Sequence, residues 1–255
     1  MKNLFTSKHS SKKEPLFLNC GLRKNGMGNR ITTICSGYAA AKINNRKPLL
    51  YWENSFGCRA EFKDIFKSID GIEETTLKET EKSEDDWFTG WDYSVKRVRD
   101  FHLKWLDKGF TEDYWYLYRE CARKIKLKDS LDAMLPKANS FSAIHIRSNW
   151  RPPSQKAVEN LKEVNGKYLL CTDNKSLYDN LMGSSKDNYW SMSEPKSNHD
   201  YMNRDLEAQK LAAVDMFTLA RANHILTLGG PSSFRNLAVL GYNVPAFKMN
   251  EGYAP

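Results

Sequence analysis

The sequence lacks long apolar segments and paired cysteine motifs, and each absence narrows the class of protein. Nowhere in its 255 residues is there an apolar run of bilayer-spanning length, and the polar, lysine-rich start has no signal-peptide core. The five cysteines are widely spaced and include no Cys-x-x-Cys pair. This pattern disfavours a disulfide scaffold or a zinc site. We therefore expect a cytoplasmic protein whose reduced cysteines serve in packing.

Two common nucleotide-binding motifs are also absent. The segment Asn25–Arg30 contains Gly26 and Gly28, but Ile31 stands where the dinucleotide fingerprint needs a third glycine. The Gly-Lys-Ser/Thr ending of a phosphate-binding P-loop does not occur in the chain. The sequence therefore argues against both NAD and ATP as the natural ligand.

Positive charge is in excess, with 39 basic and 31 acidic residues and a formal net charge of +8. This excess favours an anionic partner: a phosphate-bearing substrate, a nucleic acid or an anionic membrane surface. The basic residues are scattered and no nucleic-acid recognition motif is present, so we expect no nucleic-acid partner. Peripheral contact with a membrane stays open, although no transmembrane segment is expected.

Strand and helix patterns alternate in two parts of the chain. Residues 15–20 and 47–52 predict strands on either side of a helix that follows the loop 21–29. Residues 112–135 predict a helix. Short apolar strands and helical segments, the last of them a helix at 233–241, alternate again from residue 141 onward, which predicts a doubly wound parallel sheet. We therefore expect an α/β protein with two Rossmann-like halves facing a cleft. The expected parts are a flexible basic lead (1–14), an N-terminal half (15–137) and a C-terminal half (138–255).

The strand 142–147 carries a histidine and an arginine at its carboxyl end. Side chains alternate along a strand, so His145 and Arg147 point to the same face. An arginine ending a buried strand needs an anion, and Pro152-Pro153 makes it the start of a loop. Ligands of open α/β sheets bind outside the carboxyl ends of the strands. A structural ion pair is the simpler alternative for this arginine.

Two glycine-containing loops precede expected helices. Gly28 allows close approach of the backbone to a ligand, and the helix that follows directs free amides into the same space. Ser232 and Ser233 follow Gly229-Gly230 at a second helix start, where amides and the helix dipole favour an anion. Either serine also suits an ordinary N-cap, and the two roles are compatible.

Two aspartates carry an ambiguous signal. Asp215 falls in an inward-facing stripe of the expected helix 206–222, so its carboxylate needs hydrogen-bond donors from a structural partner or a ligand base. The stripe consists of Ala208, Leu211, Ala212, Leu219 and Ala222. Asp173 follows the expected strand 167–172, where it suits a structural or ribose-side role.

Taken in chain order, five motifs resemble the fucosyltransferase superfamily, which includes the nodulation and core α1,6-fucosyltransferases and the protein O-fucosyltransferases. They are Gly26-Met-Gly-Asn-Arg30, His145-Ile-Arg147, Thr172-Asp173, Asp215 and Ser232-Ser233-Phe234. The resemblance implies a GT-B-like architecture in which the N-terminal half (15–137) lies on the acceptor side and the C-terminal, nucleotide-sugar-binding half (138–255) holds GDP-fucose. It further implies a glycosyltransferase that inverts the anomeric centre without a metal or other cofactor.

The resemblance also implies roles for individual residues. Arg147 would bind the β-phosphate, while His145 and Asp215 would face guanine. The remaining expected donor-binding residues are Gly28, Asn29, Arg30, Asp173, Ser232, Ser233 and Phe234. Arginine and helix-start amides suit such a reaction, because negative charge builds on the leaving diphosphate as the glycosidic bond breaks.

The acceptor, a glycan or glycoconjugate hydroxyl, should need a general base. Glu53 follows the strand 47–52 and is the first candidate, Asp92 is the second, and a surface carboxylate is the simpler interpretation of each. Members of the superfamily often have a second arginine and then an acidic residue, where this chain has Ser148 and Trp150. A catalytically silent glycan- or nucleotide-binding protein, or a transferase using another nucleotide-sugar, therefore stays an alternative.

Overall fold

A computed structural model describes most of the chain. The described residues are 14–21, 26–76, 87–88, 110–137, 140–148, 152–184, 187–195, 205–230 and 232–249. Asp92, Trp150 and the basic lead up to residue 13 lie outside them. All five cysteines are described, and each is a buried free thiol, as the sequence predicts.

The N-terminal half contains a sheet of four parallel strands in the order β3-β2-β1-β4. The strands are β1 (Leu16–Asn19), β2 (Pro48–Tyr51), β3 (Glu73–Thr75) and β4 (Trp87–Phe88). The chain crosses from β1 to β2 through helix α1 (Met27–Ile43), which confirms the predicted strand-helix-strand unit. Because the strands are parallel, their carboxyl ends share one edge of the sheet with the first turn of α1.

Helix α1 is the central helix of this half. Its residues from Met27 to Ala41 are buried except for the half-buried Asn29, because strands, helices and the C-terminal half surround it. The helix begins earlier than the expected end of the loop at residue 29. Gly26 occupies the N-cap position, so Gly28, Asn29 and Arg30 form the first turn. The first turn tolerates a glycine because its N–H groups have no intrahelical partner.

Helix α2 (Phe62–Ile65) lies between β2 and β3, and the described part of the connection between the two sheets contains α5 (Glu112–Lys124) and α6 (Asp129–Asp132). The prediction of one continuous helix over residues 112–135 is wrong, because the chain is extended between α5 and α6. There Leu127 pairs with Phe66 in an antiparallel bridge, and the amide of Lys67 donates to the carbonyl of Lys126 at 2.9 Å. A contact with a distant segment therefore ends the helix where local propensity does not.

The C-terminal half contains five parallel strands in the order β7-β6-β5-β8-β9. They are β5 (Ser142–Arg147), β6 (Tyr168–Thr172), β7 (Tyr189–Trp190), β8 (His224–Gly229) and β9 (Ala246–Lys248). Strand order reverses between β5 and β8, so the topological switch point lies at their carboxyl ends.

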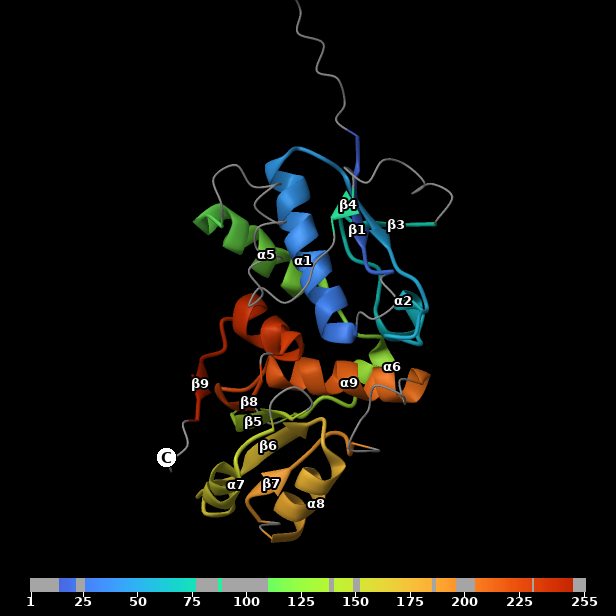
Figure 1. Cartoon of the computed structure of the whole chain (residues 1–255). Helices are drawn as coiled ribbons and strands as arrows, with labels where there is room; N and C mark the ends of the chain where they lie inside the picture. Colours follow the sequence, from blue (N-terminus) through green and yellow to red (C-terminus); the bar gives the residue numbers. More distant parts are fainter. Residues whose placement is uncertain are drawn as a thin grey trace, which may run out of the picture.

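Helices cover both faces of this second sheet, which confirms the doubly wound prediction (Figure 1). Helices α7 (Gln155–Lys162) and α8 (Lys175–Ser184) pack with Ile144, Leu170 and Leu226 on one face. On the other face lie α9 (Leu206–Leu219), the 3-10 turn η2 (Ser233–Arg235) and the π-helical turn η3 (Leu237–Gly241).

Two helix predictions in this half need correction. The segment 233–241 is not one regular helix, because it consists of the turns η2 and η3. Helix α9 ends at Leu219 and is buried on all sides from Ala213 onward. Asp215 is buried as expected, but the reason is that the whole second half of α9 is buried, not that one face of the helix points inward. The stripe that predicted it was wrong in part, because Ala208, Leu211 and Ala212 are only half-buried.

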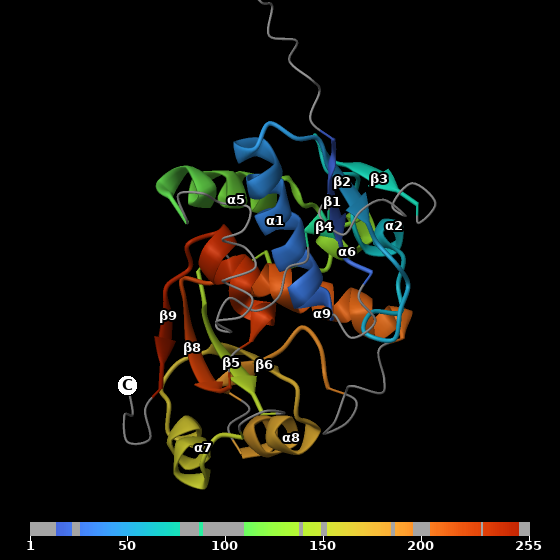
Figure 2. The ribbon, with the colours of Figure 1, turned by 45° about the horizontal axis from the view of Figure 1, so that its top comes forward.

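The two halves share one hydrophobic core. Helix α9 and the turns η2 and η3 pack against α1 and α5, and Figures 1 and 2 show the first turn of α1 beside α9. At the tightest point, a Cβ added to Gly28 would lie 2.7 Å from the backbone nitrogen of Phe234. The segment around residue 138 separates the two sheets in the chain, and its assignment as a domain boundary stays a prediction.

Gly28→Ala should destabilise the fold. The new methyl group would meet backbone atoms of Ser233 and Phe234, and such overpacking typically costs about 1–3 kcal/mol. The matched control is Gly183→Ala in α8, where an added Cβ meets nothing within 4 Å. That variant should gain about 0.5–1 kcal/mol from helix propensity. Urea unfolding of both variants checks the prediction, and an unchanged midpoint for Gly28→Ala would contradict it.

Candidate functional site

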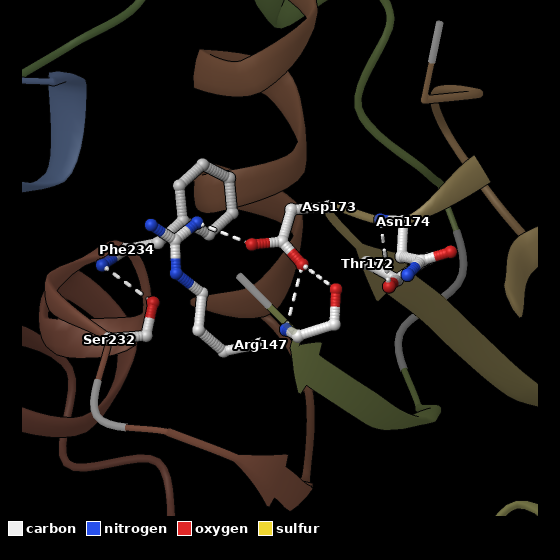
Figure 3. Close-up of polar contacts among 7 residues, drawn as sticks. Arg147, Thr172, Asp173, Asn174, Ser232 and Phe234 are labelled. Carbon is white, nitrogen blue, oxygen red and sulfur yellow. Dashed lines mark hydrogen bonds and ion pairs between the residues drawn. The ribbon is translucent and has the colours of Figure 1, made fainter. Parts of the chain in front are cut away.

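Arg147 extends from the carboxyl end of β5 and is held by Asp173, which follows β6 (Figure 3). Its Nη1 atom donates to Asp173 Oδ2 at 2.6 Å. The other carboxylate oxygen accepts from the amide and the hydroxyl of Ser148, both at 2.9 Å. The structural ion pair considered from the sequence is therefore present. The Arg147 side chain is still 24% exposed, so the pair orients the guanidinium without enclosing it.

The turn after β8 lies beside Arg147 at the switch point. Gly229 adopts a left-handed backbone with φ of 79°, and the amide of Gly230 donates to the Arg147 carbonyl at 3.1 Å. Ser232 then accepts a hydrogen bond from the Phe234 amide at 3.3 Å, which confirms its N-cap role. In Figure 3 the Arg147 side chain runs between this turn and Asp173. Ser233 and Phe234 are half-buried.

His145 lies deeper in the same site. Its side chain is 5% exposed, and its ring stacks on Phe234 with centroids 5.9 Å apart and planes inclined by 13°. Burial lowers the pKa of His145 to about 3, and the positive charges of Arg235 and Arg147 contribute. The imidazole is therefore neutral at physiological pH and acts as a hydrogen-bonding group rather than a cation.

Asp215 projects from α9 to the same face of the sheet. Ser193 donates to its Oδ2 atom, and its charge helps to raise the pKa of the nearby Cys171 thiol, on the strand next to β5. Burial raises the pKa of the Asp215 carboxyl to about 7, against the lowering effect of Ser193. This carboxyl therefore changes charge near neutral pH.

Three of the predicted site residues carry a buried polar atom without a hydrogen-bond partner. These atoms are Asn29 Oδ1, His145 Nδ1 and Asp215 Oδ1. Buried polar atoms are nearly always paired, and an unpaired one typically costs about 1–3 kcal/mol. Their occurrence on three elements at the junction of the two halves indicates a site built for a polar ligand.

The residues of the first turn of α1 differ in whether they reach this junction. Gly28 touches the η2 turn, and Asn29 has its buried oxygen. Arg30 does not reach the junction, because its side chain is fully buried and occupied elsewhere. Its Nη1 atom donates to the Glu53 carbonyl and its Nη2 atom to the Ser55 hydroxyl, both at 2.7 Å. The guanidinium carbon lies 4.6 Å from the Trp52 ring centroid. The Arg30 side chain therefore has a structural role here, and its expected contact with the donor stays a prediction.

Glu53 is exposed just beyond β2, at the edge of the N-terminal sheet that carries the first turn of α1. Its carboxylate lies near Gly21, where an added Cβ would come within 3.2 Å of Oε2. Burial raises the pKa of the Tyr51 hydroxyl, and the charge of Glu53 and a hydrogen bond with it raise that pKa further. Glu53 thus has a tyrosine partner that the sequence did not indicate.

The sequence reasoning missed two further residues. Ser148 was noted only as a departure from a family pattern, yet it holds Asp173 in place. Arg235 follows the serine-phenylalanine motif directly and brings a second positive charge near His145. The two arginines thus bring positive charge close to His145, which suits an anionic ligand.

The described residues contain neither a candidate metal cluster nor a candidate membrane-spanning helix. No group of three or more histidine, cysteine, aspartate or glutamate side chains in the described ranges could hold a metal ion. Of the helices within those same ranges, none has both the length and the apolar character needed to cross a membrane.

Neither a protein-family model nor a curated protein matches this sequence. Solved structures do match. The fucosyltransferase NodZ from Bradyrhizobium aligns at 17% identity with a TM-score of 0.62, over 93% of this chain and 95% of its own. Arabidopsis thaliana FUT1, solved in complex with GDP, aligns at 12% identity with a TM-score of 0.56, over 92% of this chain and 70% of its own.

A third structure is POFUT1 in complex with GDP-fucose, at 13% identity and a TM-score of 0.50, over 93% of this chain and 97% of its own. At such low identities the likeness shows the fold alone. The chain thus has a GT-B-like α/β fold, as the resemblance of its motifs implied. Within that class, its fold is fucosyltransferase-like across most of its length.

Asp215→Asn should change how stability depends on pH. A carboxyl whose pKa rises from an ordinary 3.8 to about 7 on folding opposes folding once it ionises. As the pH rises from about 4 to about 7, the free energy of unfolding of wild type should therefore fall relative to that of the variant, by at most about 4 kcal/mol. Urea unfolding across this range checks it, with the exposed Asp187→Asn as control. Parallel profiles for wild type and Asp215→Asn would contradict the assignment.

Proposed function

We propose that this protein is a glycosyltransferase that transfers a sugar, with L-fucose from GDP-fucose as the favoured donor, to a glycan or glycoconjugate hydroxyl. The observation that supports this most is Arg147 at the switch point, oriented by Asp173 and beside the Ser232–Phe234 turn. Neighbours of the same fold were solved with GDP or GDP-fucose. A cytoplasmic location is part of the proposal.

In the proposed reaction, the acceptor oxygen attacks the anomeric carbon as the bond from that carbon to the β-phosphate oxygen breaks. GDP leaves with the bonding electrons, and in-line attack inverts the configuration. Arg147 stabilises the charge that develops on the diphosphate, and the amides of the η2 turn assist. The reaction as proposed needs no metal, because arginine and amides supply the electrostatic stabilisation that a metal otherwise gives.

The base in this proposal is Glu53, which accepts the proton of the acceptor hydroxyl. Glu53 suits this role because it stands exposed at the edge of the N-terminal sheet that faces the C-terminal half. The donor-side partners are Gly28, Asn29, His145, Asp173, Asp215, Ser232, Ser233 and Phe234.

A catalytically silent binding protein is the second candidate. Ser148 favours it, because this residue stands where superfamily members often have a second arginine. Arg235 argues for the transferase, since it supplies a second cation close to His145 from a different loop. Separate measurements of nucleotide binding and of turnover distinguish the two candidates.

Arg147→Ala should weaken the binding of GDP. Removing a charged donor to a phosphate typically reduces affinity about 10- to 100-fold. Calorimetric titration without added metal, comparing GDP with UDP, ADP and GMP, measures the effect. Arg147→Lys keeps the charge but loses the planar guanidinium, so its affinity for GDP should lie between those of wild type and Arg147→Ala. Arg221→Ala, at the distant end of α9, is the control. Absence of GDP binding by wild type would overturn the proposed function.

Glu53→Gln should strongly reduce turnover while GDP still binds. Loss of a general base typically slows the chemical step by about 10²- to 10⁴-fold. Release of GDP from GDP-fucose in the presence of pooled oligosaccharide acceptors gives the rate. The exposed Glu74→Gln on β3 is the matched control. A Glu53→Gln variant with the turnover of wild type would exclude Glu53 as the base.

A further inference from the structure

The loop between β2 and α2 is firmly anchored to the protein at several points. Its backbone closes on itself, with Ser55 and Cys58 exchanging hydrogen bonds of 3.0 and 2.9 Å. Arg30 binds the loop from α1 through Glu53 and Ser55, and the indole of Trp52 donates to the Ala60 carbonyl at 2.8 Å. Such a loop loses little conformational freedom when a ligand binds to it.

The anchored loop exposes Glu53, Asn54, Phe56, Arg59 and Glu61 to solvent, and three of these, Glu53, Phe56 and Arg59, differ in chemical character. Phe56 is 40% exposed, and the guanidinium of Arg59 lies 5.8 Å from its ring centroid. Within the described part of the chain, no carboxylate forms an ion pair with Arg59. A single exposed aromatic residue is unremarkable by itself. Here the ring is held beside a cation on a braced loop at the ligand-binding edge of a parallel sheet.

This combination matches the chemistry of a charged sugar. The C–H groups on one face of a pyranose carry partial positive charge and suit the negative face of an aromatic ring. A guanidinium binds a carboxylate through two parallel hydrogen bonds. Glu53 and Phe56 are three residues apart, so their Cα atoms lie within about 11 Å. A sugar resting on Phe56 therefore lies near enough for a neighbouring sugar to reach Glu53.

We propose that Phe56 and Arg59 form an acceptor subsite for a negatively charged pyranose, and that Arg30 is the positioning residue that holds it. This inference rests on the proposed transferase function, since it assigns the acceptor class to the same reaction. Through its backbone and its side chain, Arg30 links the two proposed substrate sites. Its backbone lies in the α1 turn that meets η2, and its side chain fixes the loop that carries Glu53.

Calorimetric titration of the full chain with hexagalacturonate, an acidic oligosaccharide, and chitohexaose, a neutral one, tests the subsite. Hexagalacturonate should bind, and added salt should lower its affinity. Phe56→Ala and Arg59→Ala should each reduce its affinity at least tenfold, whereas Tyr116→Ala, which removes a 63% exposed aromatic ring from α5, should not. Thermal unfolding verifies that each variant folds.

Three results would overturn the subsite: no binding of hexagalacturonate, equal affinity for both oligosaccharides, or unchanged affinity in Phe56→Ala and Arg59→Ala. Titration with GDP in parallel separates this inference from the proposed function. Binding of GDP without binding of hexagalacturonate would remove the subsite and leave the transferase. Binding of hexagalacturonate that depends on Phe56 and Arg59, without binding of GDP, would retain the subsite and remove the GDP-dependent reaction.

Discussion

The close backbone contact between the first turn of α1 and the η2 turn determines how the site is assembled. Gly28 has no side chain, so the backbone of Phe234 approaches to a distance that any Cβ would prevent. This contact directs the carboxyl edge of the N-terminal sheet toward the switch point of the C-terminal sheet. It also fixes Phe234, on which His145 stacks. A hydrophobic core shared by α1, α5, α9 and η3 stabilises the contact from behind.

The electrostatics of the site follow from what is buried and what is paired. Asp173 accepts hydrogen bonds from Arg147 and Ser148, so its charge orients the arginine at the rim of the site. His145 stays neutral because burial and two nearby arginines disfavour its protonation. Burial raises the pKa of the Asp215 carboxyl to about 7, so this group is partly protonated at neutral pH. The net result is a positive rim over a polar but weakly charged interior, which suits a ligand with an anionic group joined to a neutral one.

Much of this arrangement could be predicted from local patterns. Period-two alternation placed His145 and Arg147 on one face, and apolar periodicity located the buried strands and their crossover helices. Other predictions failed where distant segments meet. The helix expected across residues 112–135 divides because Leu127 pairs with Phe66. The Arg30 side chain is buried and binds the loop after β2, a contact that no local pattern indicated. No local pattern contains the partner of such a contact, so local reasoning could not find it.

The sequence by itself determined the α/β class, the parallel order of strands and helices, and the residue types available at the strand ends, because backbone periodicity and burial are local properties. Only the tertiary structure decided which of these residues act together. It paired Arg147 with Asp173, brought Asn29 toward the C-terminal half and placed the charge of Arg235 near His145. It also fixed the loop carrying Phe56 and Arg59 through Arg30. The physical reason is that these contacts join segments far apart in the chain, and packing of the whole core selects them.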